Sequence, residues 1–300
     1  MNITQILSQE LSATTAQINA AIELLDDGAT VPFIARYRKE ATGGLDDTQL
    51  RQLAERLQYL RELEERKAVV LKSIEEQGKL SDDLRAQIEA VDNKTALEDL
   101  YLPYKPKRRT KAQIAREHGL QPLADMLLAE QPQDVEAAAQ GYLNENVPDT
   151  KAALDGARAI LMEQFAEDAE LIGTLRDKLW NEAEIHAQVI EGKETEGEKF
   201  SDYFDHREPV RTMPSHRALA VLRGRNEGVL NIALKYQPDD TPITQQSEYE
   251  QLIARRFKVS DDHKWLRDTV RLTWRAKIFL SLELEALGRL KEAADTDAIT

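Results

Sequence analysis

Clusters of lysine and arginine are the features of this sequence whose residue types and spacing favour binding chemistry. One cluster places five positive charges in seven residues, and Pro103 and Pro106 stiffen the chain that leads into it. A later stripe has spacings of three, four and four residues beside Trp274, which puts four charges on one helix face. The clusters are Lys105, Lys107, Arg108, Arg109 and Lys111; Arg207, Arg211, Arg217, Arg223 and Arg225; and Lys264, Arg267, Arg271 and Arg275. Such charges are typical of phosphate contacts and also of the solvated face of a helix, so both interpretations stay open.

The overall charge limits how strongly these clusters can bind nucleic acid. The formal net charge is -14, which argues against a chain whose main task is to grip phosphates. Lys plus Arg against Asp plus Glu is 12 to 19 in residues 1–100, 12 to 19 in residues 101–200, and 16 to 16 in residues 201–300. We therefore predict that the chain binds nucleic acid only weakly. The residues expected to contact phosphate are Lys105, Lys107, Arg108, Arg109, Lys111, Arg267, Arg271 and Arg275.

No residue pattern indicates catalysis, a cofactor or a metal site. The sequence has neither GxxxxGK[ST] nor GxGxxG after a strand, its five histidines include no pair four residues apart, and it has no cysteine. Two acidic doublets, Asp82-Asp83 and Asp261-Asp262, precede helices, where carboxylates favour the positive end of the helix dipole. We therefore expect a non-catalytic chain that binds no metal and no cofactor.

The composition is that of a helix-rich globular protein. The chain is 41% hydrophobic with few aromatics and 13 glycines, and 300 residues can bury a sizeable core. The N-terminus lacks a basic segment followed by an apolar core, and no apolar run approaches the roughly 20 residues of a membrane span. The sequence thus predicts a cytoplasmic protein with no membrane partner.

Helical periodicity predicts a mainly all-α fold. Leu50, Leu53, Leu57 and Leu60 form a buried stripe on one long helix from about Thr48 to Gln77, which we expect to pack against a partner helix as a hairpin. Stacked short helices follow, and residues 229–236 are the best strand candidate, so at most one or two short strands are expected. The charged, weakly periodic stretch 191–210 indicates a boundary between an N-terminal domain, residues 1–190, and a central region, residues 191–300.

The stretch VPFIARYRKEATGGLDD, residues 31–47, can be explained as a short docking helix between two longer ones. Phe33, Ile34 and Tyr37 form an apolar strip, and Asp46 with Gln49 resembles a capping box that opens the long helix. That explanation leaves three basic residues without a role: Arg36, Arg38 and Lys39.

Three separated segments resemble the Tex family, the bacterial transcription accessory proteins. They are VPFIARYRKEATGGLDDTQL, LEDLYLPYKPKRRTKAQIAREHGLQPLA and MPSHRALAVLRGRNEGVL, and the match runs in order through essentially all of the chain. Family members are longer and continue into a YqgF-type RNase H-like domain, helix-hairpin-helix elements and an OB-fold that binds nucleic acid. The chain therefore resembles a fragment or a truncated relative that leads toward a missing RNase H-like domain.

The resemblance implies a helical scaffold with a helix-turn-helix-like element, a cytoplasmic setting, and RNA or DNA as partner, mainly through domains beyond residue 300. Transcription machinery is a further expected partner. Two functions stay open: the scaffold and interaction part of a nucleic-acid-binding transcription accessory factor, or the regulatory half of a nuclease-like enzyme whose catalytic domain lies beyond residue 300.

Overall fold

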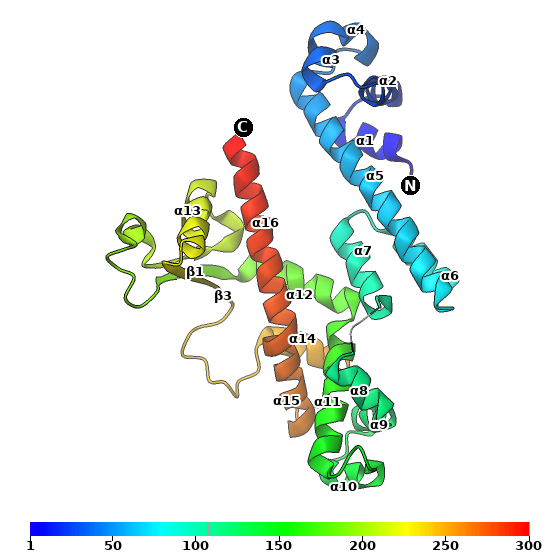
Figure 1. Cartoon of the computed structure of the whole chain (residues 1–300), viewed down its shortest axis with the longest axis vertical. Coiled ribbons are helices and arrows are strands. Elements are labelled where there is room, and N and C mark those ends of the chain that lie inside the picture. Colours follow the sequence, from blue (N-terminus) through cyan, green and yellow to red (C-terminus); the bar gives the residue numbers. More distant parts are fainter. Residues whose placement is uncertain (107–108, 300) are drawn as a thin grey trace. The chain divides into compact units, whose positions relative to one another are not determined.

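The computed structural model describes residues 1–106 and 109–299, and the chain forms two compact units, Met1–Pro106 (unit 1) and Lys107–Thr300 (unit 2) (Figure 1). This division falls after Pro106, whereas the sequence indicated a boundary at residue 190. Near residue 190 the chain stays within one core, because α12 (Ala169–Glu182) and β1 (Glu184–Val189) are separated only by buried Ala183. No helix in the described part of the chain is long and apolar enough to cross a membrane.

Unit 1 is built around one long helix, as the leucine stripe predicts. Its elements are α1 (Ile3–Leu11), α2 (Thr15–Asp26), α3 (Val31–Tyr37), α4 (Lys39–Thr42), α5 (Asp47–Glu76), α6 (Asp82–Ala90), α7 (Lys94–Tyr101) and the 3-10 helix η1 (Leu102–Tyr104). The predicted capping box is confirmed: Asp46 Oδ1 accepts from the Gln49 N–H at 2.8 Å, and Gln49 Oε1 accepts from the Asp46 N–H at 3.1 Å.

The long helix α5 has several short partners rather than one partner of its own length. Leu50, Leu53, Leu57 and Leu60 are buried as predicted, and they join a core formed with α1, α2 and α3. Further along α5, Leu63 begins a second core that includes residues of α6 and α7. A period of 3.6 residues shows which face of a helix is buried, but it does not show how many segments cover that face.

Unit 2 is helical around one small antiparallel sheet. The helices before the sheet are α8 (Lys111–Glu117), α9 (Gln121–Glu130), α10 (Val135–Ala139), η2 (Gln140–Tyr142), α11 (Thr150–Ala166) and α12. Then follow β1, η3 (Glu198–Tyr203), β2 (Asp205–Pro209), η4 (Val210–Thr212), α13 (Ser215–Asn226), β3 (Leu230–Lys235), α14 (Glu248–Arg256), α15 (Lys264–Thr273), the π-helix η5 (Trp274–Ile278) and α16 (Phe279–Ile299). The mainly all-α class is confirmed.

The sheet has the order β2-β1-β3, so two of its three strands were not predicted. The predicted strand is β3, within residues 229–236. The central strand β1 has three consecutive buried residues instead of an alternating pattern, and the edge strand β2 reads Asp-His-Arg-Glu-Pro. Charged residues and proline are common on edge strands because they discourage further pairing, and they also remove the apolar signal of a strand.

The helices α15, η5 and α16 run as one rod through unit 2, with α11, α12 and α13 packed against it (Figure 1). This rod carries the predicted stripe of arginines. The π-helix that starts at Trp274 contains the last of them, Arg275.

Candidate nucleic-acid interface

The described residues of the 105–111 cluster are exposed, but they are not all free of acidic partners. Lys105 follows η1 at the end of unit 1, while Arg109 and Lys111 belong to unit 2. Arg109 donates to Glu117 at 2.6 Å, so a carboxylate eight residues away offsets one predicted phosphate contact. Lys107 and Arg108 lie outside the described residues.

Thr110 sets the direction of the chain between Arg109 and Lys111. Its hydroxyl caps α8 by accepting from the Gln113 N–H at 3.1 Å, and it also lies 3.2 Å from Glu163 Oε2 of α11. Lys111 is therefore the first residue of a capped helix, with its side chain in solvent. Together with Lys105 it is a described charge of this cluster that remains available to phosphate.

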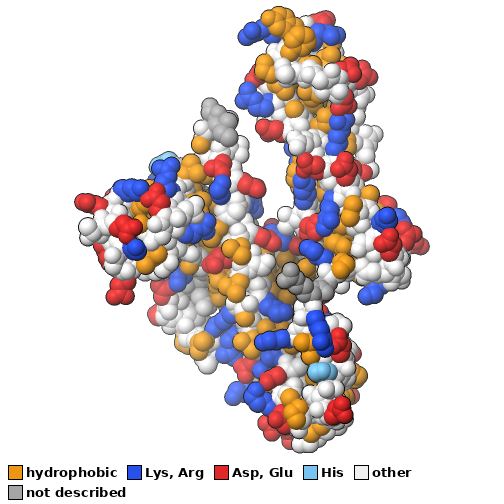
Figure 2. Space-filling view, in the orientation of Figure 1, with side chains coloured by type: hydrophobic (Ala, Val, Ile, Leu, Met, Phe, Trp, Pro, Cys, Tyr) orange, Lys and Arg blue, Asp and Glu red, His pale blue; other side chains and the backbone are white. Residues whose placement is uncertain are grey.

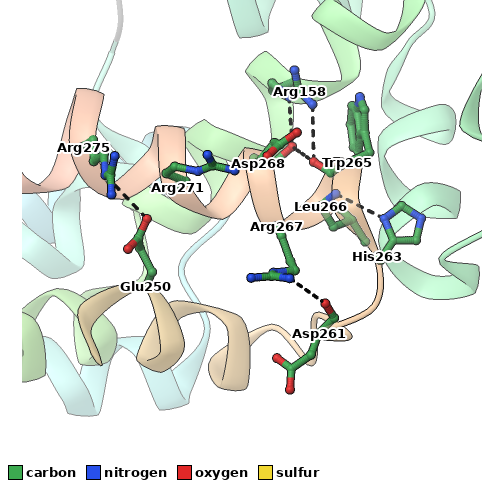
Figure 3. Close-up of polar contacts among 11 residues, drawn as sticks. Arg158, Glu250, Asp261, His263, Trp265, Leu266, Arg267, Asp268, Arg271 and Arg275 are labelled. Atoms are coloured by element: carbon green, nitrogen blue, oxygen red, sulfur yellow. Dashed lines mark hydrogen bonds and ion pairs between the residues drawn. The ribbon is translucent and has the colours of Figure 1, made fainter. Parts of the chain in front are cut away.

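The arginines of the 264–275 stripe differ in how much of their charge is compensated (Figure 3). Arg271 pairs with Asp268 on its own helix, and Arg275 lies with its Nε 3.7 Å from Glu250 Oε1 of α14. Arg267 instead donates to the backbone carbonyl of Asp261 at 3.1 Å. A carbonyl oxygen orients a guanidinium without removing its charge, so Arg267 is the arginine of the stripe best suited to an anion.

The inner part of the stripe is a packed and partly buried polar region. Glu250 is 1% exposed, and its other oxygen accepts from the Ser247 N–H at 2.7 Å in a capping box. Within the described part of the chain, three buried side-chain polar atoms make no hydrogen bond: Tyr249 OH, Trp274 Nε1 and Arg275 Nε. The pairing of Arg275 with Glu250 is therefore electrostatic, and it serves the packing of α14 on η5 rather than a surface.

Arg158 of α11 reaches the stripe from the opposite side and was not found from the sequence. It donates to Thr269 Oγ1 at 3.0 Å and to the Trp265 carbonyl at 3.3 Å, and its guanidinium lies 4.6 Å from the centre of the Trp265 ring (Figure 3). Burial lowers the pKa of Arg158 from its ordinary value, although Asp268 and Asp155 oppose that shift. Nothing in the local sequence around Arg158 signals this role, because its partners are more than 100 residues away.

The N-terminus of α15 is fixed by the side chain of His263. His263 Nε2 lies 2.7 Å from the Pro132 carbonyl and must donate to it, while Nδ1 accepts from the Leu266 N–H at 3.2 Å (Figure 3). This arrangement anchors the start of the stripe to the segment after α9.

A cleft of about 590 Å³ opens beside Arg267, where α14, α15 and the loop between them meet. Its lining residues are Gln246, Gln251, Ala254, Arg255, Val259, Ser260, Asp261 and Arg267. The polar residues that line it carry two guanidinium groups, two amides, a hydroxyl and one carboxylate, which is a donor-rich set suited to a phosphate group. Arg255 was missed by the sequence analysis; the run Arg255-Arg256-Phe257-Lys258 was its available signal.

Two arginines of the second basic cluster are engaged in ion pairs. Arg217 forms a two-pronged pair with Glu208 at 2.8 and 3.0 Å, and Arg207 pairs with Asp239. In the part of the chain that the structure describes, no three His, Asp or Glu side chains are placed to hold a metal ion.

Fold and site thus define a mainly helical protein with a small sheet and a donor-rich cleft at the start of its C-terminal rod. Residues 1–75 match the model of the Tex-like protein N-terminal domain, and residues 130–300 match the model of the Tex central region-like family. The chain belongs to the Tex family.

Similar proteins place this chain in the N-terminal part of longer proteins. It is 95% identical over 300 residues to the transcriptional accessory protein Tex of Neisseria gonorrhoeae, with all of this chain and 40% of that protein covered. It is 55% identical to protein YhgF of Escherichia coli, over 98% of this chain and 39% of the relative. S1 RNA-binding domain-containing protein 1 of Homo sapiens is 28% identical over 77% of this chain and 24% of its own length. The chain spans about 40% of the length of its bacterial relatives.

Proposed function

We propose that this chain is the helical scaffold and interaction part of a nucleic-acid-binding transcription accessory factor that works in the cytoplasm. The names of the relatives support this: one is a transcriptional accessory protein and another carries an S1 RNA-binding domain. The observation that carries the proposal is the pair Arg255 and Arg267, two guanidinium groups in one donor-rich cleft.

The proposed contact with nucleic acid is weak and is not sequence-specific. A few phosphate contacts on a chain of net charge -14 correspond to a dissociation constant of about 10⁻⁴ to 10⁻⁶ M, which assists a stronger module elsewhere in the full-length protein. The helix-turn-helix-like element implied by the family adds no major-groove contact to this proposal. The net charge of -14 is an acidic excess that repels phosphate.

A salt titration of the chain on a duplex DNA tests the proposal. Each lost phosphate contact flattens the slope of log K against log salt by about 0.9 units. The Arg255→Ser/Arg267→Ser variant and the Lys107→Ser/Arg108→Ser/Arg109→Ser variant should both show this change with unaltered sequence preference.

Arg271→Ser is the matched control, because Asp268 already compensates that arginine. Its slope should equal that of the wild type. The proposal fails if neither multiple variant changes the slope, or if the wild type binds one sequence at nanomolar concentration and physiological salt.

We also propose that the chain itself has no catalytic activity. The sequence has no nucleophile with a positioned base and no metal-ligand motif. The other function considered, the regulatory half of a nuclease-like enzyme, is therefore only the second candidate. The purified chain should leave labelled RNA and DNA intact with Mg²⁺ or Mn²⁺. Cleavage that a point substitution within residues 1–300 abolishes would contradict this.

A further inference from the structure

The α3–α4 end of unit 1 exposes two aromatic rings that the docking-helix interpretation would bury. Ile34 of α3 is 0% exposed, but Phe33 is 46% and Tyr37 is 61% exposed. Their ring centres lie 5.4 Å apart with 48° between the planes. The expected apolar strip therefore holds α3 in place through Ile34 alone, and the two rings need another explanation.

Uncompensated positive charge surrounds these rings. Arg38 pairs with Glu40 at 3.1 Å, whereas Arg36 and Lys39 are exposed and form no ion pair with any residue that the structure describes. Figure 2 shows lysine and arginine side chains beside exposed hydrophobic ones over this end of unit 1. Such a local excess of cations contrasts with the acidic balance of the unit as a whole.

The rings stand on a rigid support. Thr30 caps α3 by accepting from the Phe33 N–H at 3.3 Å, and Pro32 occupies its first turn. The following turn is tied back to α2, because Gln17 Nε2 donates to the Thr42 and Gly43 carbonyls, both at 3.2 Å. Gly43 has a φ of +64°, and a Cβ there would lie 2.8 Å from Gln17 Nε2, so a larger residue would disturb this tie.

We propose that Phe33, Arg36, Tyr37 and Lys39 form a tip surface that binds single-stranded nucleic acid. Exposed aromatic faces accept unpaired bases by stacking, and adjacent cations hold the phosphates that follow each base. A duplex offers the cations its phosphates but hides its base faces, so the rings select for single strands. This inference rests on the proposed function, since it adds a contact for the same class of ligand in the other unit of the chain.

Charge and ring chemistry together distinguish this ligand from an acidic protein segment. A polyanionic peptide would satisfy Arg36 and Lys39 but has no planar groups that stack regularly on Phe33 and Tyr37. Single-stranded RNA supplies both features in every nucleotide.

The test measures binding of a 12-nucleotide oligouridine to the whole chain at several salt concentrations. Phe33→Ala/Tyr37→Ala should weaken binding about 5- to 150-fold for a stacked base and leave the salt slope unchanged. Arg36→Ser/Lys39→Ser should instead flatten the slope by about 0.7 units for each lost contact. Phe33→Tyr/Tyr37→Phe keeps both rings and should bind as the wild type does.

Two control variants match these changes elsewhere in unit 1. Val69→Ala removes an exposed apolar side chain, and Arg51→Ser removes an exposed arginine that is already paired with Asp47 at 2.7 Å. Neither should change the affinity or the slope. Thermal unfolding of each variant confirms that the support is intact.

The outcomes separate this inference from the proposed function. If the Arg255→Ser/Arg267→Ser variant loses affinity while the ring variant binds normally, the tip surface is wrong and the proposed function stands. The inference is also overturned if the chain prefers duplex DNA over the oligouridine, or if polyglutamate of equal charge competes as well as the oligouridine does. No detectable binding of either nucleic acid at 1 mM chain and low salt overturns both.

Photo-crosslinking gives a positional answer that does not depend on variants. An oligonucleotide of 4-thiouridine crosslinked to the chain should yield, on mass spectrometry, modified peptides that contain Phe33 or Tyr37. Modified peptides confined to unit 2 would contradict the tip surface.

Discussion

In unit 1 the cations of the tip surface lie in solvent beside two exposed rings, whereas in unit 2 two arginines of the 264–275 stripe, Arg271 and Arg275, lie against carboxylates. Arg36 and Lys39 form no ion pair with a described residue. Arg275 faces a nearly buried glutamate of α14, and Arg158 of α11 packs on Trp265. The number of positive charges in the sequence therefore does not show how much charge is available to a ligand.

The reason for this difference is what lies around each cluster after folding. The tip surface sits where a short helix meets a turn, so few other segments can reach it. The stripe lies on a rod with α11, α12, α13 and α14 around it, and α14 supplies the carboxylate of Glu250 to Arg275. A buried cation without such partners would cost several kcal/mol, so packing and neutralisation occur together.

The strongest test of this comparison removes Glu250, the partner of Arg275. Glu250→Ala should lower the free energy of unfolding of unit 2 by about 3–5 kcal/mol, because it leaves a partly buried guanidinium unpaired. Glu117→Ala, which removes the exposed partner of Arg109, should cost about 0–1 kcal/mol. Urea denaturation followed by tryptophan fluorescence measures both, since Trp180, Trp265 and Trp274 all lie in unit 2.

Glu250→Gln separates charge from capping in that experiment. Glutamine can keep the capping box with Ser247 while it removes the negative charge. If Glu250→Ala lowers the free energy of unfolding by less than 1 kcal/mol, Arg275 does not need this partner.

A second prediction asks whether the core of unit 1 depends on α5 as the leucine stripe indicates. Leu57→Ala should destabilise unit 1 by about 2–5 kcal/mol, because Leu57 is 5% exposed within the core that α1, α2 and α3 share with α5. Hydrogen exchange of the α5 amides measures the change, and tryptophan fluorescence shows whether unit 2 is unaffected. Val69→Ala, on the exposed side of the same helix, should stay within about 0.5 kcal/mol of the wild type.

The elements that could be predicted from the sequence are those with a strong local signal. The stripe from Leu50 to Leu60 located α5, the pair Asp46 and Gln49 located its start, and residues 229–236 contained β3. The strands β1 and β2 were missed, because β1 has consecutive buried residues and β2 is a polar edge strand. Their identity as strands depends on pairing between residues 17 or more positions apart, for example His186 with Arg207, which no local pattern shows.

The candidate site was only partly predictable for the same reason. Arg267 was named from the spacing of its helix, but its neighbour in the cleft, Arg255, comes from α14. Helical spacing predicted Arg271 and Arg275 as phosphate contacts in the same way as Arg267. In the structure, Asp268 lies against Arg271 and Glu250 lies against Arg275. The exposure of Phe33 and Tyr37 was the opposite of the sequence expectation, since an apolar strip on a short helix can be wider than the surface that covers it.

A third prediction compares two arginines of unit 2 that differ in burial. Arg158→Ala should cost about 1.5–3 kcal/mol, because it removes hydrogen bonds from a charged group to Thr269 and Trp265 together with the ring contact. Arg109→Ala, at a solvent-exposed position, should stay within about 0.5 kcal/mol of the wild type. Tryptophan fluorescence suits this measurement because Trp265 itself touches Arg158. If Arg158→Ala and Arg109→Ala lowered the free energy of unfolding equally, the contacts of the buried arginine would add no stability beyond those of the exposed one.

The smallest expected effect concerns Glu208 on β2, whose carboxylate accepts from Arg217 and lies 2.9 Å from His206 Nε2. The hydrogen bond from Arg217 is the main reason that the pKa of Glu208 is lowered in the folded protein, and burial opposes it. A carboxyl group whose folded pKa lies below its unfolded value stabilises the fold above the unfolded pKa of about 4.3, and this contribution is lost as the pH falls through the folded pKa. The free energy of unfolding of the wild type should therefore fall more between pH 5 and pH 3 than that of Glu208→Gln. Because Arg217 is 37% exposed, the difference should be about 1 kcal/mol or less and should shrink in high salt.

Glu194→Gln, at an exposed loop position with no ion pair to a described residue, should retain the pH dependence of the wild type. If Glu208→Gln also follows the wild type between pH 5 and pH 3, this ion pair adds nothing to the stability of unit 2, and the charge of Arg217 is available to a ligand.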